Sequence, residues 1–184
     1  MIVFSFISIL LLAATHLSIE AFSAETPRRS EGKDSAERQR NGYCLMCPPD
    51  WIQFERNCYK FNFSRLDWAD SERACTGIGA NLASVHTKEE YDFLRDTIHQ
   101  VTGQHTTAWL GGYDATKEGV WLWSDGSHFD FRYWGPGEPN NVEKGTEHCM
   151  QMNFRGLNYV NDIPCNFLLA SICKKRMEQC VCFR

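Results

Sequence analysis

The clearest elements in the pattern of apolar and polar positions are two helices. Asp67 precedes residues 68–75, which carry acidic side chains in their first turn and end before a pair of glycines, so we expect a helix with Asp67 as its N-cap. Thr87 and Glu90 form the capping-box pattern, and apolar residues follow them at near-helical spacing. This pattern predicts a second helix, which ends at Gly103.

Short β-strands are predicted on either side of these helices. Residues 51–63 bring aromatic and β-branched side chains into rough alternation with polar ones, which is typical of a hairpin. After the second helix, apolar segments separated by Gly-, Pro- and Asn-rich turns predict further strands at residues 108–110, 120–123, 148–152 and 171–174. The order of helices and strands indicates an α+β domain.

The N-terminal part of the chain differs from the rest in composition. Residues 1–24 contain an apolar stretch that is too short to span a bilayer comfortably and that ends in small residues, so we expect a cleaved signal peptide and a secreted protein without a membrane anchor. Residues 25–43 are charged and polar, which indicates a propeptide or a flexible arm. The folded domain is predicted to occupy residues 44–184.

Composition and charge narrow the class of protein further. Nine cysteines in a chain of 184 residues indicate an oxidising compartment and a disulfide framework, and their odd number leaves at least one without a partner in the same chain. The net charge of -4 provides no basic surface for a nucleic acid. We therefore expect an extracellular, disulfide-bonded domain that does not bind nucleic acid.

A long polar segment, residues 133–147, interrupts the predicted strands, and a loop of this kind is usually functional. Carboxylate and amide oxygens, the ligands that calcium prefers, gather in this segment and shortly after it. Because calcium takes about six to eight oxygens, five such side chains leave room for ligands from outside the protein, and two vicinal sugar hydroxyls fit that room. The predicted calcium ligands are Glu138, Asn140, Glu147, Asn161 and Asp162.

The same residues also allow other interpretations. Glu-Pro-Asn at 138–140 is by itself an ordinary turn sequence, although Pro139 in the cis form would place its two neighbours on the same side. A hydrolase would use Glu138 with Glu147 or Asp162 as acid and base, but the sequence offers no nucleophile–base spacing and no oxyanion motif. We therefore expect a binding protein and not an enzyme.

Motifs with a characteristic order run along residues 47–174: Cys47 to Trp51, Cys58-Tyr59, Cys75, Trp109 to Gly112, Trp121 to Asp125, the Glu-Pro-Asn at 138–140, Cys149, Cys165 and Cys173. On these motifs the chain resembles the C-type lectin-like domain family. The resemblance implies a C-type lectin-like fold, with two helices, small antiparallel sheets and a long calcium-binding loop, held together by disulfides. The chain departs from the family at Val160, where a tryptophan is usual.

The resemblance also implies a specificity and a disulfide pattern. Glu138, Asn140, Glu147 and Asn161 would contact the sugar, and the Glu-Pro-Asn order is similar to that of binders of mannose-like glycans with equatorial 3- and 4-hydroxyls. The reverse polarity, Gln-Pro-Asp, goes with galactose, because it exchanges the hydrogen-bond acceptor and donor offered to the two hydroxyls. The implied disulfides are Cys47 with Cys58, Cys75 with Cys173 and Cys149 with Cys165.

The family's second calcium site matches Asp114, Glu118, Asn141 and His148. Two of these four positions lack a carboxylate, so we expect a weak calcium site at Asp114, Glu118 and Asn141. On the residues alone, His148 is expected to face solvent. The six tryptophans are expected in the core rather than on a binding surface: Trp51, Trp68, Trp109, Trp121, Trp123 and Trp134.

Three cysteines remain outside the implied disulfides. Cys44 could pair with Cys180 or with Cys182, which would join the two ends of the domain and leave one thiol for a disulfide-linked homodimer. Zinc binding by these three cysteines together with Cys47 is the other interpretation. Asn62 begins an N-glycosylation sequon.

Two functions follow as hypotheses. The first is calcium-dependent binding of mannose-like glycans, used to recognise microbial surfaces in innate defence. The second is a module of the same fold that binds ice or a protein instead of a sugar. Since members that do not bind sugar usually lose several ligands of the calcium site, the complete set of five favours the first.

Overall fold

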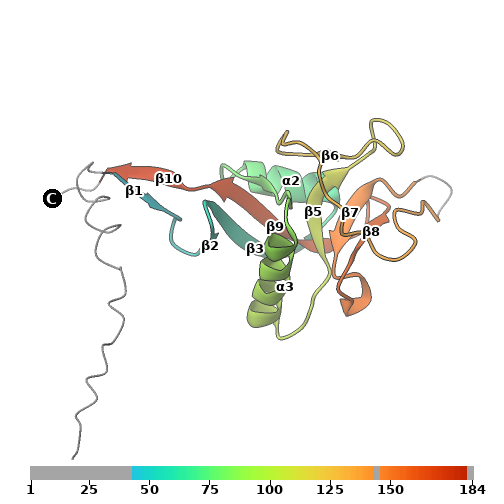
Figure 1. Cartoon of the computed structure of the whole chain (residues 1–184), viewed down its shortest axis with the longest axis horizontal. Coiled ribbons are helices and arrows are strands. Elements are labelled where there is room, and N and C mark those ends of the chain that lie inside the picture. The colour runs from blue at the N-terminus through green and yellow to red at the C-terminus, as the bar shows by residue number, and fades with distance from the viewer. Residues whose placement is uncertain (1–42, 143–145, 182–184) are drawn as a thin grey trace, which may run out of the picture.

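The computed structural model describes residues 43–142 and 146–181 (Figure 1). The predicted signal peptide, nearly all of the predicted arm, and Cys182 lie outside the described residues. The elements are β1 (Tyr43–Met46), β2 (Ile52–Phe54), β3 (Asn57–Leu66), α2 (Trp68–Thr76), β4 (Asn81–Leu82), α3 (Lys88–Thr102), β5 (Ala108–Tyr113), β6 (Leu122–Trp123), β7 (Cys149–Met152), η1 (Phe154–Gly156), β8 (Val160–Ile163), β9 (Leu169–Arg176) and β10 (Glu178–Val181).

Both predicted helices are confirmed with their caps. The Asp67 carboxylate accepts a hydrogen bond from the backbone N–H of Asp70 at 2.7 Å, which begins α2. The Thr87 hydroxyl accepts from the N–H of Glu90 at 3.0 Å, which begins α3, and Gly103 ends α3 in the left-handed conformation with φ 74°. Glycine adopts the left-handed conformation with little strain because it has no Cβ atom. The glycine at position 103 therefore ends α3.

The predicted capping box is only half formed, because the Glu90 carboxylate has other partners. It accepts from the backbone N–H of His86 at 2.8 Å, from the Lys174 ammonium at 2.6 Å and from the Tyr59 hydroxyl. Burial, together with the negative charge of Glu90, raises the pKa of Tyr59, so this phenol stays a hydrogen-bond donor. The buried Glu90–Lys174 ion pair thus ties α3 to β9.

The strands form one eight-stranded sheet and a separate two-stranded ribbon. The order in the large sheet is β2-β3-β9-β5-β7-β8, with β4 paired to β9 and β6 paired to β5. The expected small antiparallel sheets are joined into a mixed sheet, because β9 lies parallel to β5 as well as antiparallel to β3. The ribbon of β1 and β10 extends away from the body, at the opposite end of the molecule from β7 and β8 (Figure 1).

Four strands were not predicted from the sequence, namely β1, β4, β8 and β10. β8 contains Asn161 and Asp162, which have low intrinsic strand preference, and pairing with β7 overrides that preference. The departure at Val160 does not disturb packing, because this side chain is fully buried in the main core cluster. The parallel bridge between Trp134 and Val160 brings the long loop against β8.

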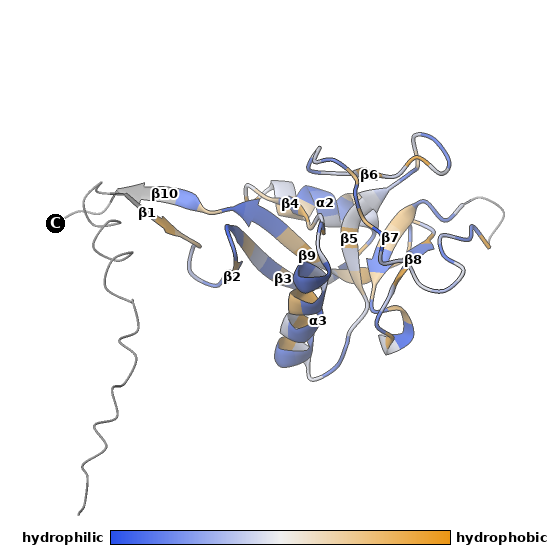
Figure 2. Cartoon of the chain, viewed as in Figure 1, coloured by the Kyte–Doolittle hydropathy of each residue, from blue (hydrophilic) through white to orange (hydrophobic). Residues whose placement is uncertain are grey.

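The core lies between the two helices and the sheet. Hydrophilic and hydrophobic residues both occur along β3 and β9 (Figure 2), and Ala170 to Cys173 of β9 are buried in succession. Because successive side chains of a strand point to opposite faces, both faces of the sheet supply buried side chains here. Trp109, Trp121 and Trp123 are buried as predicted, whereas Trp51, Trp68 and Trp134 are only partly buried at the edges of the core clusters. Among the described residues, no helix is both long and apolar enough to cross a membrane.

The three disulfides implied by the family resemblance are confirmed. Cys75–Cys173 joins α2 to β9, and Cys149–Cys165 joins β7 to the segment after β8. Because Cys47 is bonded to Cys58, the zinc interpretation that needed Cys47 is wrong. In the ribbon, the backbone of Cys44 is paired in register with that of Cys180.

Candidate metal centre

The structure brings the five predicted calcium ligands together from three places in the chain. Glu138 and Asn140 come from the long loop, Glu147 stands just before β7, and Asn161 and Asp162 lie on β8. All except Asp162 line a hollow of about 420 Å³. The antiparallel pairing of β7 with β8 is what places the end of the loop beside Asn161 and Asp162.

Asp162 and Glu147 anchor the loop through its backbone. The fully buried Asp162 carboxylate accepts from the N–H of Asn140 at 3.1 Å and from the N–H of Asn141 at 3.2 Å. The N–H of Val142 donates to Glu147 at 2.9 Å and to Asn140 Oδ1 at 3.0 Å. These hydrogen bonds fix the loop by the same carboxylates that are predicted to hold the ion, so the site is largely pre-organised.

Glu138 lies beside the negative charges of Asp162 and Glu147. The peptide bond between Glu138 and Pro139 is cis, as expected. Oε2 of Glu138 is buried and has no hydrogen-bond partner in the described structure. Desolvation raises the pKa of Glu138 to about 7, with further contributions from Asp162 and Glu147. A divalent cation would remove this penalty, so these residues fit a calcium ion.

Asn161 is held by its own neighbour. Its side-chain amide donates to the backbone carbonyl of Asp162 at 2.7 Å, and both residues are buried on β8. The amide oxygen of Asn161 is thereby turned away from that carbonyl. Because Asn161 also lines the hollow, its amide oxygen is a candidate neutral ligand beside the carboxylates.

Residues that the sequence analysis missed also line the hollow. Val142 follows the Glu-Pro-Asn segment closely and is 73% exposed, so its position next to predicted ligands was the available signal. Phe154, Arg155 and Phe167 also line it, but they lie far along the chain from Glu138, and no local pattern marks them.

The residues of the predicted second calcium site also come together. His148 Nδ1 lies 2.9 Å from Asp114 and 3.7 Å from Glu118, and the side-chain amide of Asn141 donates to Glu118. The expectation that His148 faces solvent is wrong, because its side chain is 28% exposed and hydrogen-bonded to the buried Asp114. Asn141 also accepts from the N–H of Glu147, so it connects the two sites.

Comparison with known proteins gives the family. The pattern of the Lectin C-type domain family matches residues 64–175, which include both clusters described above. The chain belongs to the C-type lectin domain family. Ladderlectin from Oncorhynchus mykiss is 38% identical over 183 residues, which cover 94% of each chain.

Two further relatives of this C-type lectin domain carry different names. The galactose-specific lectin nattectin from Thalassophryne nattereri is 38% identical over 71% of this chain and 81% of its own. The solved structure of herring type II antifreeze protein is 36% identical, with a TM-score of 0.67 over 72% of this chain and all of that one. The fold is therefore that of C-type lectin domains, and the family includes proteins with different ligands.

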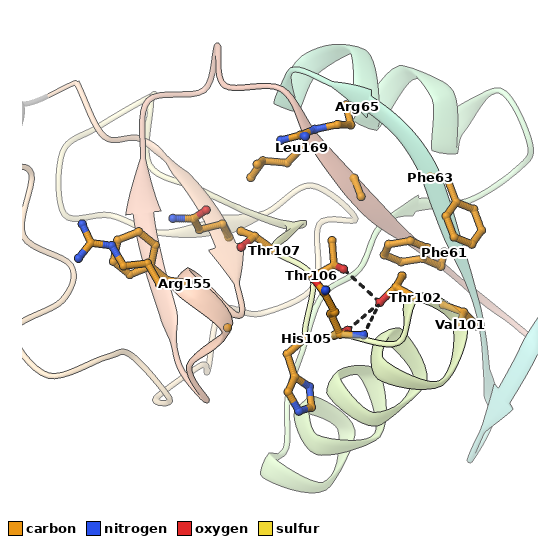
Figure 3. Close-up of a pocket in the computed structure, with 15 residues that line it drawn as sticks. Phe61, Phe63, Arg65, Val101, Thr102, His105, Thr106, Thr107, Arg155 and Leu169 are labelled. Carbon is orange, nitrogen blue, oxygen red and sulfur yellow. Dashed lines mark hydrogen bonds between the residues drawn. The ribbon is translucent and has the colours of Figure 1, made fainter.

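A larger hollow of this lectin domain, about 950 Å³, lies between the end of α3 and strands of the sheet (Figure 3). It adjoins the hollow at the metal centre, with which it shares Gln151, Phe154 and Arg155. Phe61, Phe63 and Arg65 line it from β3, and Thr102 lines it from α3, where its hydroxyl donates to the backbone carbonyl of Gln104 at 2.7 Å. Its lining contains no carboxylate and includes arginines. Its chemistry is therefore unsuited to a cation.

One polar cluster of the lectin domain superficially resembles a hydrolase triad. His86 Nδ1 lies 2.8 Å from Asp130, and Nε2 lies 3.2 Å from the Ser84 hydroxyl. However, Ser84 is 1% exposed and donates to Asp125 at 2.6 Å. Burial raises the pKa of Asp125, but hydrogen bonds from Ser127 and Ser84 outweigh this effect and leave it lowered. The Ser84 hydroxyl is therefore committed to Asp125 and is not accessible as a nucleophile.

Proposed function

We propose that this C-type lectin domain is a secreted lectin that binds glycans through a calcium ion held by the five side chains of the metal centre. The observation that carries the proposal is the buried, unpartnered oxygen of Glu138 among the carboxylates of Asp162 and Glu147. When bound, calcium would supply a positive charge and open coordination positions for hydroxyl groups. The role of the protein is to hold the surrounding acceptors and donors in place.

The polarity of the site favours mannose-like glycans. Glu138 and Glu147 would accept hydrogen bonds from two vicinal hydroxyls, and the amide groups of Asn140 and Asn161 would donate to them. Asn140 Oδ1 accepts from the N–H of Val142, so its NH2 group lies on the other side of the amide. This order matches equatorial 3- and 4-hydroxyls. Nattectin is named as galactose-specific, so the sugar class has to be tested directly.

The exposed side chain of Val142 supports binding of a sugar ring. Val142 lines the hollow beside Asn140, and an apolar group at that position can pack against ring carbons while the calcium ligands hold the hydroxyls. Such a shallow site binds one sugar weakly. Recognition of a microbial surface would therefore use several sites at once.

Affinity chromatography tests the proposal. The protein is passed over mannose-agarose and galactose-agarose in calcium and eluted with EDTA. Retention on mannose with release by EDTA is expected, and Asp162→Asn should abolish retention, because it removes both a ligand and the acceptor that holds the loop. A matched control is Asp130→Asn, which changes a carboxylate outside the metal centre. Retention that survives EDTA would contradict the proposal.

Ice binding is the second candidate, because the herring antifreeze protein has the same fold at 36% identity. Thermal hysteresis measured with and without calcium distinguishes the two. A lectin should show none at concentrations at which it is fully retained on mannose. Clear hysteresis without sugar retention would make ice the ligand.

A further inference from the structure

The second acidic cluster has a composition that differs from an all-oxygen calcium site. Asp114, Glu118 and His148 each offer one ligand atom, and these atoms lie within 4.8 Å of one another. The cluster lies beside the principal metal centre but shares none of its five ligands. Its metal preference therefore depends on its own three side chains.

Asp114 is a rigid and buried member of this cluster. It is 1% exposed, and its Oδ2 accepts from the N–H of Gly119 at 2.8 Å. Its own N–H donates to the backbone carbonyl of His148 at 3.1 Å, which links the end of β5 to the start of β7. Asp114 Oδ1 is thus fixed facing His148 Nδ1, so two of the potential ligands are pre-positioned by backbone contacts.

Asn141, the third predicted ligand of this calcium site, does not turn its amide oxygen toward the cluster. Asn141 turns its NH2 group toward Glu118, while its amide oxygen accepts from the N–H of Glu147. The cluster therefore offers two carboxylates and an imidazole. Calcium prefers about six to eight oxygens, whereas imidazole nitrogen with carboxylate suits zinc and similar transition metals.

The spacing of the ligand atoms agrees with zinc. A tetrahedral ion with bonds of about 2.0–2.1 Å separates its ligand atoms by about 3.3 Å. The distances from His148 Nδ1 to Asp114 and to Glu118 are 2.9 Å and 3.7 Å, on either side of that value. Glu118 is 58% exposed, so it can adjust, and the open side leaves a position for water.

We propose that Asp114, Glu118 and His148 form a zinc-type transition-metal site that is separate from the calcium site. The exchange of a carboxylate for His148 makes the site selective for a metal that accepts nitrogen. This inference does not depend on glycan binding, because none of its ligands contacts the proposed sugar position. Zinc would stabilise the junction of β5 and β7 behind the loop.

Calorimetric titration with zinc chloride tests this proposal. The protein, expressed without a histidine tag, is first saturated with calcium so that the principal centre is filled. One zinc ion per chain is expected. His148→Asn should weaken zinc binding at least about tenfold, since even the mutation of a residue that only hydrogen-bonds to a metal ligand lowers metal affinity by about that factor. A cobalt titration provides a second readout, because Co²⁺ in a tetrahedral site absorbs visible light much more strongly than aqueous Co²⁺, and His148→Asn should remove these bands.

Matched variants identify the site. His99→Asn changes a histidine that stacks on His105 elsewhere, and it should leave zinc binding intact. Asp130→Asn changes a carboxylate outside both sites and should also leave zinc binding intact. His148→Asp restores an all-oxygen set, so zinc affinity should fall while a second calcium ion binds. Absence of zinc binding, or equal binding by wild type and His148→Asn, would overturn the proposal.

Discussion

At the scale of single residues, the metal centre brings the carboxylates of Glu138, Glu147 and Asp162 together. The Asp162 carboxylate accepts hydrogen bonds from two backbone N–H groups, and the Glu147 carboxylate accepts a hydrogen bond from a third. Oε2 of Glu138 is buried without a hydrogen-bond partner in the described structure. Desolvation and the charges of Asp162 and Glu147 raise the pKa of Glu138. The ionised Glu138 carboxylate is therefore unfavourable in the metal-free protein.

The first prediction concerns pH and the stability of the metal-free protein. The pKa of Glu138 rises from 4.5 to about 7 on folding, so the folded state binds more protons than the unfolded state between these values. The contribution of Glu138 to stability should therefore fall as pH rises from 4.5 to 7. Thermal unfolding in EDTA, compared with Glu138→Gln, measures it. The variant should lack this contribution, and identical pH profiles would refute the prediction.

The second prediction concerns sugar preference. Exchanging the polarity of the loop with Glu138→Gln and Asn140→Asp keeps the number of oxygens but swaps the carboxylate and amide positions. We expect the double variant to lose retention on mannose-agarose and to gain retention on galactose-agarose, still in calcium. If it keeps its preference for mannose, the sugar is chosen by other residues such as Val142.

At the scale of elements, α3 is attached to the sheet by a buried ion pair as well as by its apolar face. The side chains of Glu90 and Lys174 are 6% and 10% exposed, and Tyr59 and His86 add hydrogen bonds to the same carboxylate. A buried charge is tolerated only with its partner. The pair therefore fixes how the helix sits on β9, and its loss should be costly.

Glu90→Gln should lower the free energy of unfolding by about 3–5 kcal/mol, because Lys174 is left buried without a counter-charge. Urea unfolding with the disulfides intact measures this effect. The control is Asp92→Asn, which breaks the half-exposed pair with Lys88 on the same helix. It should cost at most about 0.5 kcal/mol. Similar losses for the two variants would contradict the prediction.

At the scale of the whole molecule, the two-stranded ribbon and the metal centre occupy opposite ends (Figure 1). The register of β1 and β10 sets the backbone of Cys44 opposite that of Cys180, which favours this pairing over Cys44 with Cys182. Cys182 would then be available for an interchain disulfide. A dimer joined near the ribbon would leave both metal centres facing outward, as multivalent binding requires.

Under oxidising conditions the protein should therefore run as a covalent dimer on a non-reducing gel, and Cys182→Ser should convert it to a monomer. Gel filtration provides the second measurement. The control is Cys44→Ser, which should release a thiol without removing Cys182. A Cys182→Ser variant that remains covalently dimeric would assign the interchain bond to another cysteine.

The sequence by itself determined the elements whose causes are local. The caps at Asp67 and Thr87 and the glycine at 103 specify the two helices, because each satisfies or releases backbone groups within a few residues. The five predicted ligands were recognisable because calcium requires particular oxygen types. Their prediction as one site rested as much on the resemblance to a known family as on these local patterns.

Only the tertiary structure decided features that depend on strand pairing. β8 forms from polar residues because β7 lies beside it, and Glu90 leaves its capping role because β9 brings Lys174 within 2.6 Å. The contact of His148 with Asp114 likewise arises where β5 and β7 meet. Such contacts join residues that are far apart in the chain. The local sequence around a buried charge therefore does not indicate which distant side chain will compensate that charge.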